Sequence, residues 1–370
     1  MAIYYVSCAL LFAYGLVTRA AFPAARQADK RIVYAVFGLW FLLLALRHPA
    51  MGLDLGYEAQ RGYLVSFQAL NEFPLEMVRD VAGIRPYETG YVLFNILVGK
   101  IWNNRQFLLA VCAALSVLPI GWALAKESCD GGLTAAVYMA LPCSLLGFSA
   151  LRQAVALGFL MLALCCVLRR KPVLFLLLVV LAAQFHKASY LFLVAYPVYH
   201  VPVNFRWRLV SLALLPLLYV LRRPLYMFAV SHIYSMYNIP DNNGSVNLLI
   251  LYVLLYLFCT VFQYCERGAA ESGEEARRVN GLMNLFYGAV FCQVFAGIHN
   301  VAARMGYPFT LALPLLLPLV VSRIRDARTR QLIRSLLLLF FAGFALLAIW
   351  RMGWARAWDY RFFWQSPPQF

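Results

Sequence analysis

The chain has 370 residues, of which 63% are hydrophobic and 13% are charged, and its formal net charge is +16. This composition excludes a water-soluble globular protein and predicts an all-α, polytopic integral membrane protein. The excess of Lys and Arg does not indicate nucleic-acid binding, because positive charge in membrane proteins gathers in cytoplasmic loops.

Apolar segments of helical length follow one another along the whole chain, and we expect one domain of residues 1–370. The segments lie near 2–18, 32–46, 89–102, 106–124, 133–149, 153–168, 172–185, 188–201, 209–221, 248–264, 280–298, 306–321 and 335–350. They predict about twelve transmembrane helices plus one re-entrant or partial segment, since several are shorter than the roughly 20 residues of a straight span.

Basic stretches between these segments predict the orientation. They are 19–31, 169–171, 204–208, 265–278 and 322–334, and we place all of them in the cytoplasm. The apolar segments between residues 31 and 170 are odd in number, so they cannot all cross and still return the chain to the cytoplasm. One of them must be re-entrant or partly inserted, with 89–102 and 133–149 as candidates. Irregular backbone at that depth requires protein or water around it, which predicts a cavity.

This orientation leaves outer-face elements near 47–88, 222–247 and 351–370, and short corners at 150–152, 186–187 and 299–304. They hold many ionisable residues, namely Arg47, Asp54, Glu58, Arg61, Arg85, Glu88, Arg152, His186, Lys187, Arg222, Arg223, His299 and Arg304. Ionisable groups at the membrane are costly and indicate a functional site. For any single arginine, snorkelling to lipid headgroups is an equally good interpretation, but it does not account for the whole set.

Individual candidates have alternative interpretations. Arg152 is either an interface anchor or a planar fork that binds a phosphate through two hydrogen bonds. His186 is either an interfacial histidine or a base, since a neutral imidazole accepts a proton at physiological pH. Asp54 and Tyr57 either solvate a loop or face a substrate. Asn242, in the turn sequence DNNGS, either shapes that turn or hydrogen-bonds a sugar.

Two further outer-face segments have predicted roles. The segment 63–81 has the pattern of an interfacial amphipathic helix. The tail 351–370 is rich in aromatic residues, which favours an interfacial aromatic belt, with stacking on carbohydrate as the alternative.

The order of these motifs resembles the EpsG family of bacterial membrane proteins, which belongs with the Wzy-type polysaccharide polymerases. The resemblance rests on RHPAMGLDLGY (47–57), YETGYVLFN (87–95), LRQAVA (151–156), AAQFHKAS (182–189), ARMGYPF (303–309) and DYRFFW (359–364). It spans nearly the whole chain in the family's order. One departure is Ala188, where such sequences often have Ser or Thr, so we assign no hydroxyl role there.

The resemblance implies a GT-C-like architecture and a glycosyltransferase that joins oligosaccharide repeat units carried on undecaprenyl diphosphate. The expected location is the bacterial cytoplasmic (inner) membrane with the active site on its outer, periplasmic side, and the product would be O-antigen, capsule or exopolysaccharide. The expected partners are the lipid-linked oligosaccharides, membrane lipid, a chain-length regulator and a flippase, and no nucleic acid. No cofactor is expected, and the lack of an Asp-Xaa-Asp motif predicts a metal-independent enzyme.

The chemistry assigns roles to the candidates. A departing diphosphate needs cations, for which the sequence offers Arg47, Arg152, Arg304 and Lys187. The acceptor hydroxyl must lose a proton, and His186 is the first candidate for the base, with Asp54 and Glu88 as alternatives. The candidates for contact with the sugars are Tyr57, Tyr91, Gln153, His299, Tyr307 and Asn242.

Proteins of other classes would share some of these features. A lipid-linked oligosaccharide ligase uses almost the same chemistry and is the closest alternative. A lipid-linked sugar flippase would place charges in the middle of its spans and show duplicated halves, and neither feature is visible here. A membrane O-acyltransferase would need its histidine and arginine on the cytoplasmic side.

Overall fold

The computed structural model describes all residues except 23–24, 58–61, 75–86, 234–245, 268–272 and 369–370. The described residues form α-helices and short 3₁₀ helices without a β-strand, which confirms the predicted all-α class. The chain divides into two compact units: unit 1 comprises residues 1–190 and 334–370, and unit 2 comprises residues 191–333.

Several helices are long and apolar enough to cross a membrane. Within the described residues there are five: α1 (Ala2–Ala21), α6 (Arg105–Glu127), α8 (Leu151–Leu168), the first 19 residues of α13 (Val246–Arg267) and α17 (Ala327–Arg351). The number rises to eight if each of three bent helix pairs is one span. This fits a polytopic membrane protein, while the expected total of about twelve spans stays a prediction.

The three bent pairs overlap segments that the sequence predicted to enter the membrane. They are α7 (Gly131–Ala140) with η2 (Pro142–Phe148), bent by 66°, α11 (Phe205–Ala213) with α12 (Leu215–Ile233), bent by 51°, and α15 (Asn300–Thr310) with α16 (Leu313–Ser322), bent by 45°. The first pair covers the candidate re-entrant segment 133–149. The other candidate, 89–102, forms α5 (Thr89–Ile101), which at 13 residues is too short for a straight span.

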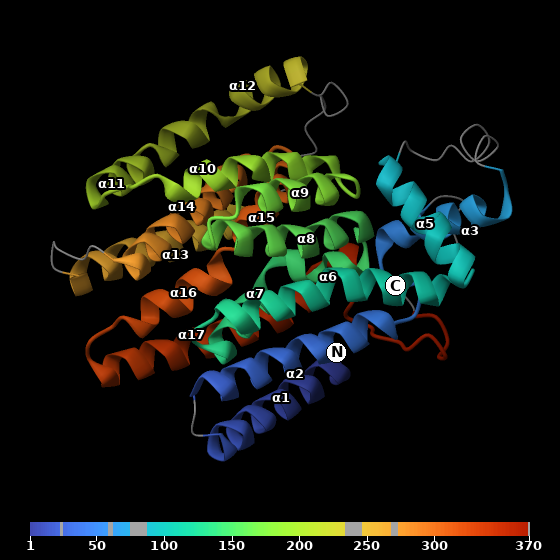
Figure 1. Cartoon of the computed structure of the whole chain (residues 1–370), viewed down its shortest axis with the longest axis horizontal. Helices are drawn as coiled ribbons and strands as arrows, with labels where there is room; N and C mark the ends of the chain where they lie inside the picture. Colours follow the sequence, from blue (N-terminus) through green and yellow to red (C-terminus); the bar gives the residue numbers. More distant parts are fainter. Residues whose placement is uncertain (23–24, 58–61, 75–86, 234–245, 268–272, 369–370) are drawn as a thin grey trace. The chain divides into compact units, whose positions relative to one another are not determined.

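Unit 1 is a layer of neighbouring helices with α8 near its centre. Helices α1, α2 (Ala25–Ala45), α6, α8 and α9 (Pro172–Ala183) lie side by side in that order (Figure 1). Glycine allows α6 and α8 to approach closely, since a Cβ at Gly158 would lie 2.2 Å from the carbonyl oxygen of Leu115. α8 therefore packs closely on α6, and its first turn carries Arg152.

Two short helices, α3 (Tyr63–Glu72) and α5, pack on each other at the end of unit 1 where α6 begins (Figure 1). α3 covers the first part of the segment that the sequence predicted as an interfacial helix. Its residues Tyr63, Leu64, Phe67 and Leu70 are buried, so this helix packs on protein along one face. The rest of the predicted segment, from residue 75 onward, lies outside the described residues.

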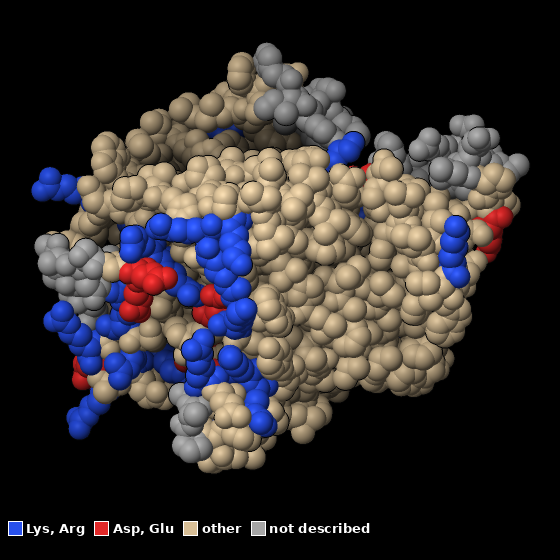
Figure 2. Space-filling model, viewed as in Figure 1, with Lys and Arg blue, Asp and Glu red and all other residues tan. Residues whose placement is uncertain are grey.

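Charged side chains are absent from the middle of α6 and α8. Figure 2 shows a band without Lys, Arg, Asp or Glu over α6 and α8, with a dense basic group at one end and a few charged side chains at the other. Such a band is expected where helices face hydrocarbon, because a charged side chain there costs several kcal/mol, roughly 2.5–3.5 on insertion scales.

Ion pairs connect the ends of α1, α2, α7 and α17 at the basic end of unit 1. Arg19, in the last turn of α1, donates to Asp29 at 3.0 Å and lies 3.6 Å from Asp130. Arg334 of α17 also pairs with Asp130. The basic stretches 19–31 and 322–334 predicted a cytoplasmic location, and they also hold helix ends together.

In unit 2, a buried arginine joins three helices. Arg208 of α11 is 3% exposed and donates to the hydroxyl of Tyr256 on α13 at 2.9 Å and to the side-chain oxygen of Asn280 on α14 (Glu274–Val294) at 2.6 Å. Asn284 donates in turn to the carbonyl of Val201, which follows α10 (Ala195–His200). The sequence treated Arg208 only as part of a cytoplasmic basic loop, but the structure gives it a role in packing.

Residues 360–363, near the C-terminus, pack against residues 43–48 at the end of α2. His48 donates its backbone N–H to the carbonyl of Arg361 at 2.7 Å, and Phe363 donates to Leu46 at 2.9 Å, around a β-bridge between Arg47 and Phe362. The hydroxyl of Tyr360 donates to the carbonyl of Leu43 at 2.7 Å. The aromatic tail is therefore attached to the segment that carries Arg47, and the choice between membrane belt and carbohydrate stacking stays open.

Gly52 permits the loop after α2 to pack against η2. Its φ is +120°, which side chains rarely adopt, and a Cβ there would lie 1.8 Å from the carbonyl oxygen of Phe148. We expect Gly52→Ala to destabilise the protein by about 2 kcal/mol or more, because backbone must move to relieve both conflicts. The midpoint of thermal unfolding in detergent measures this.

Gly38 provides the matched control for that substitution. It lies inside α2, and a Cβ there meets no atom within 4 Å. Gly38→Ala should leave the midpoint unchanged or raise it, by up to about 1 kcal/mol in stability. Equal midpoints for the two variants would show that the loop does not need glycine at residue 52.

Candidate active site

Arg152 lies in the first turn of α8 and is held by two other segments. Its Nη1 donates to the Oε2 atom of Glu88, and its Nε donates to the hydroxyl of Tyr63 at 3.3 Å. The guanidinium also lies 4.7 Å from the ring centroid of Tyr87, a cation–π distance. The side chain remains 20% exposed, so the cation is fixed in position and still accessible.

Glu88 links Arg152 to the His-Lys corner. Its Oε2 pairs with Arg152, and its Oε1 accepts the backbone N–H of Lys187 at 3.1 Å. The carboxylate is 9% exposed. Three motifs that are far apart in the sequence, around residues 88, 152 and 187, therefore meet at one place in unit 1.

The His-Lys corner is the turn between α9 and the 3₁₀ helix η3 (Lys187–Val194). His186 donates its N–H to the carbonyl of Ala182 at 3.0 Å, which closes the end of α9. Gln184, just before it, accepts the N–H of Tyr91 at 3.0 Å. His186 is half-buried and Lys187 is exposed, so both fit a polar corner at the end of a span and not a buried core.

Tyrosine rings form a wall beside Arg152. The rings of Tyr63, Tyr87 and Tyr91 contact one another with centroid distances of 5.5 to 5.9 Å. Burial raises the pKa of Tyr63, the charge of Arg152 lowers it, and the charge of Asp54 raises it further. The net effect is a raised pKa, which keeps the Tyr63 phenol protonated at neutral pH.

Asp54 is attached to the segment that precedes Arg152. It lies in the 3₁₀ helix η1 (Leu53–Leu55) and donates its backbone N–H to the hydroxyl of Ser149 at 3.1 Å, while its side chain is exposed. Tyr57 is half-buried, with its ring 5.0 Å from that of His48. Gln153 is buried in the first turn of α8, next to Arg152.

The model of a known protein family matches this chain over residues 30–362. The chain belongs to the EpsG family. EpsG is a family of Wzy-like polysaccharide polymerases, so the resemblance seen in the motifs is confirmed. No curated protein and no solved structure matches the chain.

One predicted diphosphate ligand of this EpsG chain has other contacts. Arg47 is 1% exposed, and its guanidinium donates to the carbonyl oxygens of Gly147 and Phe148 and lies 5.1 Å from the ring centroid of Phe148. These contacts hold the end of η2, just before Ser149 and Arg152. Arg47 therefore stabilises the backbone that leads into Ser149 and Arg152. Binding of diphosphate by Arg47 stays a prediction.

The remaining candidates of the EpsG chain lie elsewhere. His299, Arg304 and Tyr307 belong to unit 2, where all three are half-buried and the ring of His299 stacks on Tyr226 with centroids 6.3 Å apart. Their participation in the same site as Arg152 stays a prediction. Asn242 lies outside the described residues.

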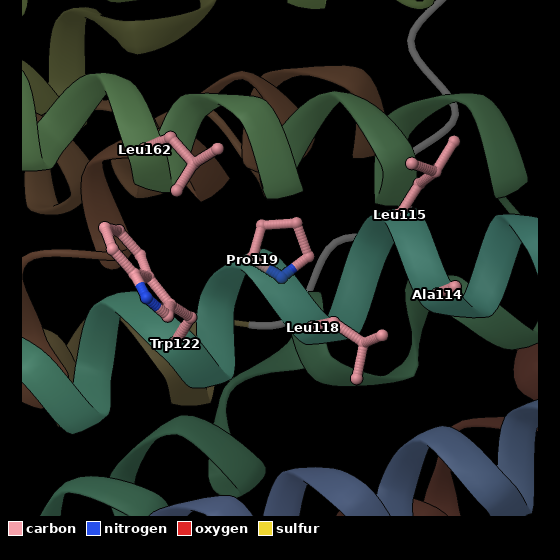
Figure 3. A pocket seen from close by; sticks show the side chains of 6 residues that line it. All are labelled: Ala114, Leu115, Leu118, Pro119, Trp122 and Leu162. Atoms are coloured by element: carbon pink, nitrogen blue, oxygen red, sulfur yellow. The ribbon is translucent and has the colours of Figure 1, made fainter.

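An open groove on unit 1 is not part of this site. It lies between α6 and α8, has a volume of about 520 Å³, and is lined only by apolar residues, which are Ala114, Leu115, Leu118, Pro119, Trp122 and Leu162 (Figure 3). With no polar lining residue, the groove offers no group for sugar or diphosphate chemistry.

The sequence did not identify three residues that shape the site. Tyr63, Tyr87 and Ser149 contact Arg152 or position Asp54. Tyr87 and Ser149 are close in sequence to Glu88 and Arg152, which is the one signal that could have indicated them. Tyr63 has no such neighbour, and its role depends on how α3 packs. No group of three or more His, Cys, Asp or Glu in the described part of the chain is arranged to hold a metal ion.

Proposed function

We propose that this EpsG protein joins undecaprenyl-diphosphate-linked oligosaccharide repeat units into polysaccharide at the outer face of the cytoplasmic membrane. The observation that supports this most directly is the Arg152 cluster. An accessible guanidinium, fixed by Glu88 and Tyr63, lies beside the corner that carries His186 and Lys187. Membership of a polymerase family supplies the reaction class.

The reaction follows from this arrangement. A hydroxyl oxygen of the acceptor sugar attacks the anomeric carbon of the donor, and the bond between that carbon and the diphosphate oxygen breaks. The electron pair leaves with the lipid diphosphate, whose growing negative charge is stabilised by charge-assisted hydrogen bonds from Arg152 and Lys187. Arg47 and Arg304 remain further candidates for this role.

The acceptor's proton passes to a base in the same step. His186 is our first choice, with Asp54 and Glu88 as alternatives. In this proposal the protein cations replace a divalent ion, so the transfer is metal-independent. Tyr57, Tyr91, Gln153, His299, Tyr307 and Asn242 are proposed contacts for the sugars.

The orientation rests on the distribution of charge. The basic end of unit 1 fits the cytoplasm by the positive-inside rule, and the Arg152 cluster lies at the N-terminal end of α8, whose C-terminal end is followed by the basic stretch 169–171. We therefore propose that the site faces the periplasmic side. About twelve spans in a GT-C-like arrangement, a flippase that supplies substrate and a chain-length regulator complete the proposal.

A deletion strain distinguishes polymerase from ligase, the alternative that shares this chemistry. We expect the strain to display glycans of a single repeat unit, because flipping and transfer continue without polymerisation. Return of the gene on a plasmid should restore long chains. A strain that instead accumulates full-length glycan on its lipid carrier, with none transferred, would identify a ligase.

A further inference from the structure

Glu88 occupies the N-cap position of α5 but does not cap that helix. An N-cap side chain commonly accepts a hydrogen bond from an N–H of its own first turn. The side chain of Glu88 makes no such bond. Both of its oxygens are instead used by other segments, Oε2 by Arg152 of α8 and Oε1 by the backbone N–H of Lys187. The carboxylate therefore connects three parts of unit 1 that are distant in sequence.

The same parts are also joined independently of this carboxylate. Tyr91 donates its N–H to the carbonyl of Gln184 at 3.0 Å, and Gly90 packs so closely that a Cβ there would lie 2.4 Å from the Cβ of Gln184. α5 thus stays attached to the His-Lys corner through backbone contacts. A change confined to the Glu88 side chain should alter the position of Arg152 without separating these elements.

We propose that Glu88 is a positioning residue and not the base. It holds the guanidinium of Arg152 and the backbone of the His186–Lys187 corner at a fixed relative position. The carboxylate is 9% exposed and bonded on both oxygens, whereas Asp54 is exposed and His186 is half-buried. Nη1 of Arg152 is engaged by Glu88 and Nε by Tyr63, and in this arrangement Nη2 is the nitrogen that meets the diphosphate.

This inference rests on the proposed glycosyl transfer, and one substitution separates it from the alternative. In Glu88→Gln the amide oxygen still accepts from Lys187, but the charge that orients Arg152 is lost. We expect kcat to fall about 10- to 100-fold, since a misplacement of about 1 Å costs up to about 10²-fold, and KM for the lipid-diphosphate donor to rise. The acidic limb of the pH–rate profile should stay at the pH of the wild type, because the base is still present. Glu88→Asp should recover part of the rate, since it restores the charge.

Glu127 supplies the matched control. It forms the same kind of ion pair with Arg169, far along α6 and α8 from the Arg152 cluster. Glu127→Gln should leave kcat and KM unchanged. If Glu88→Gln removed the acidic limb, Glu88 would be the base. If it left kcat and KM within twofold of the wild type, Glu88 would have no positioning role.

A measurement without turnover keeps this inference separate from the proposed function. Hydrogen exchange of the Lys187 amide, followed by mass spectrometry of a peptide covering 184–190, should be faster in Glu88→Ala than in the wild type and close to wild type in Glu88→Gln. If the exchange rates differ between the variants as expected but the wild-type protein does not polymerise lipid-diphosphate donors, the proposed function is overturned. The contact between Glu88 and Lys187 is then still established. Unchanged exchange in Glu88→Ala would overturn the positioning role itself.

Discussion

Arg152→Lys should reduce polymerisation at least about 10²-fold although the positive charge is kept. A lysine ammonium is a point charge, so it cannot pair with Glu88, contact Tyr63 and present a planar fork to a diphosphate at the same time. Loss of preorganised charge stabilisation of this kind costs about 10²–10³-fold in other enzymes. The measurements are polymer length and amount in cells, and the rate of the purified protein with a lipid-diphosphate donor.

Arg351→Lys is the control for this substitution. Arg351 ends α17, is exposed, and lies 4.8 Å from the ring centroid of Trp350, so it is an arginine beside an aromatic ring at a helix end, as Arg152 is. Its replacement should not change the polymer. Normal polymer in Arg152→Lys as well would mean that Arg152 only anchors α8 at the membrane interface.

His186→Ala should bind the donor nearly normally but polymerise about 10²–10⁴-fold more slowly, the usual contribution of a general base. The reason is geometric: His186 lies in the corner whose Lys187 N–H is bound by Glu88, and its side chain is half-buried at the end of an apolar helix. Donor affinity and single-turnover rate, measured separately on purified protein, test the two halves of the expectation.

The alternative base for this step is Asp54. Its side chain is exposed, and its backbone N–H donates to the hydroxyl of Ser149, three residues before Arg152. His200→Ala, at the end of α10, controls for the general loss of an imidazole. If His186→Ala kept its rate within a few-fold of the wild type while Asp54→Asn was inactive, the base would be Asp54, and His186 would only orient the substrate.

Hydropathy and motif order predicted the class and the family, and they placed residues 88, 152 and 187 among the candidates on the outer side of the membrane. They did so because each motif stands at the end of an apolar segment, and segment ends on one side of a membrane are brought close together by the fold. The sequence could not predict which side chains contact each other there. Arg47 and Arg152 each stand at an end of an apolar segment, yet one is buried against two carbonyls and the other pairs with Glu88. The difference arises because η2 ends against Arg47, and a contact between segments so far apart in the sequence is set by the tertiary fold.

Helix breaks limited the prediction of spans in the same way. Segment 133–149, a candidate re-entrant segment in the sequence, bends by 66° between α7 and η2. Ser144 bonds to local carbonyls near this bend, and Arg47 donates to the carbonyls at the end of η2. Partners from distant segments satisfy this irregular backbone, and hydropathy contains no information about them. Arg208 shows the converse, since a charge that marks a loop in the sequence is buried by neutral polar partners in the fold.

The attachment of residues 357–363 to the start of unit 1 has a consequence for biosynthesis. Tyr360 and its acceptor Leu43 are 317 residues apart, and the hydroxyl of Tyr4 likewise donates to the carbonyl of Ala357 at 2.9 Å. The intervening helices are therefore synthesised before the backbone partners of Leu46 and His48 exist. The segment around Arg47 therefore acquires these contacts only after residues 357–363 have been synthesised.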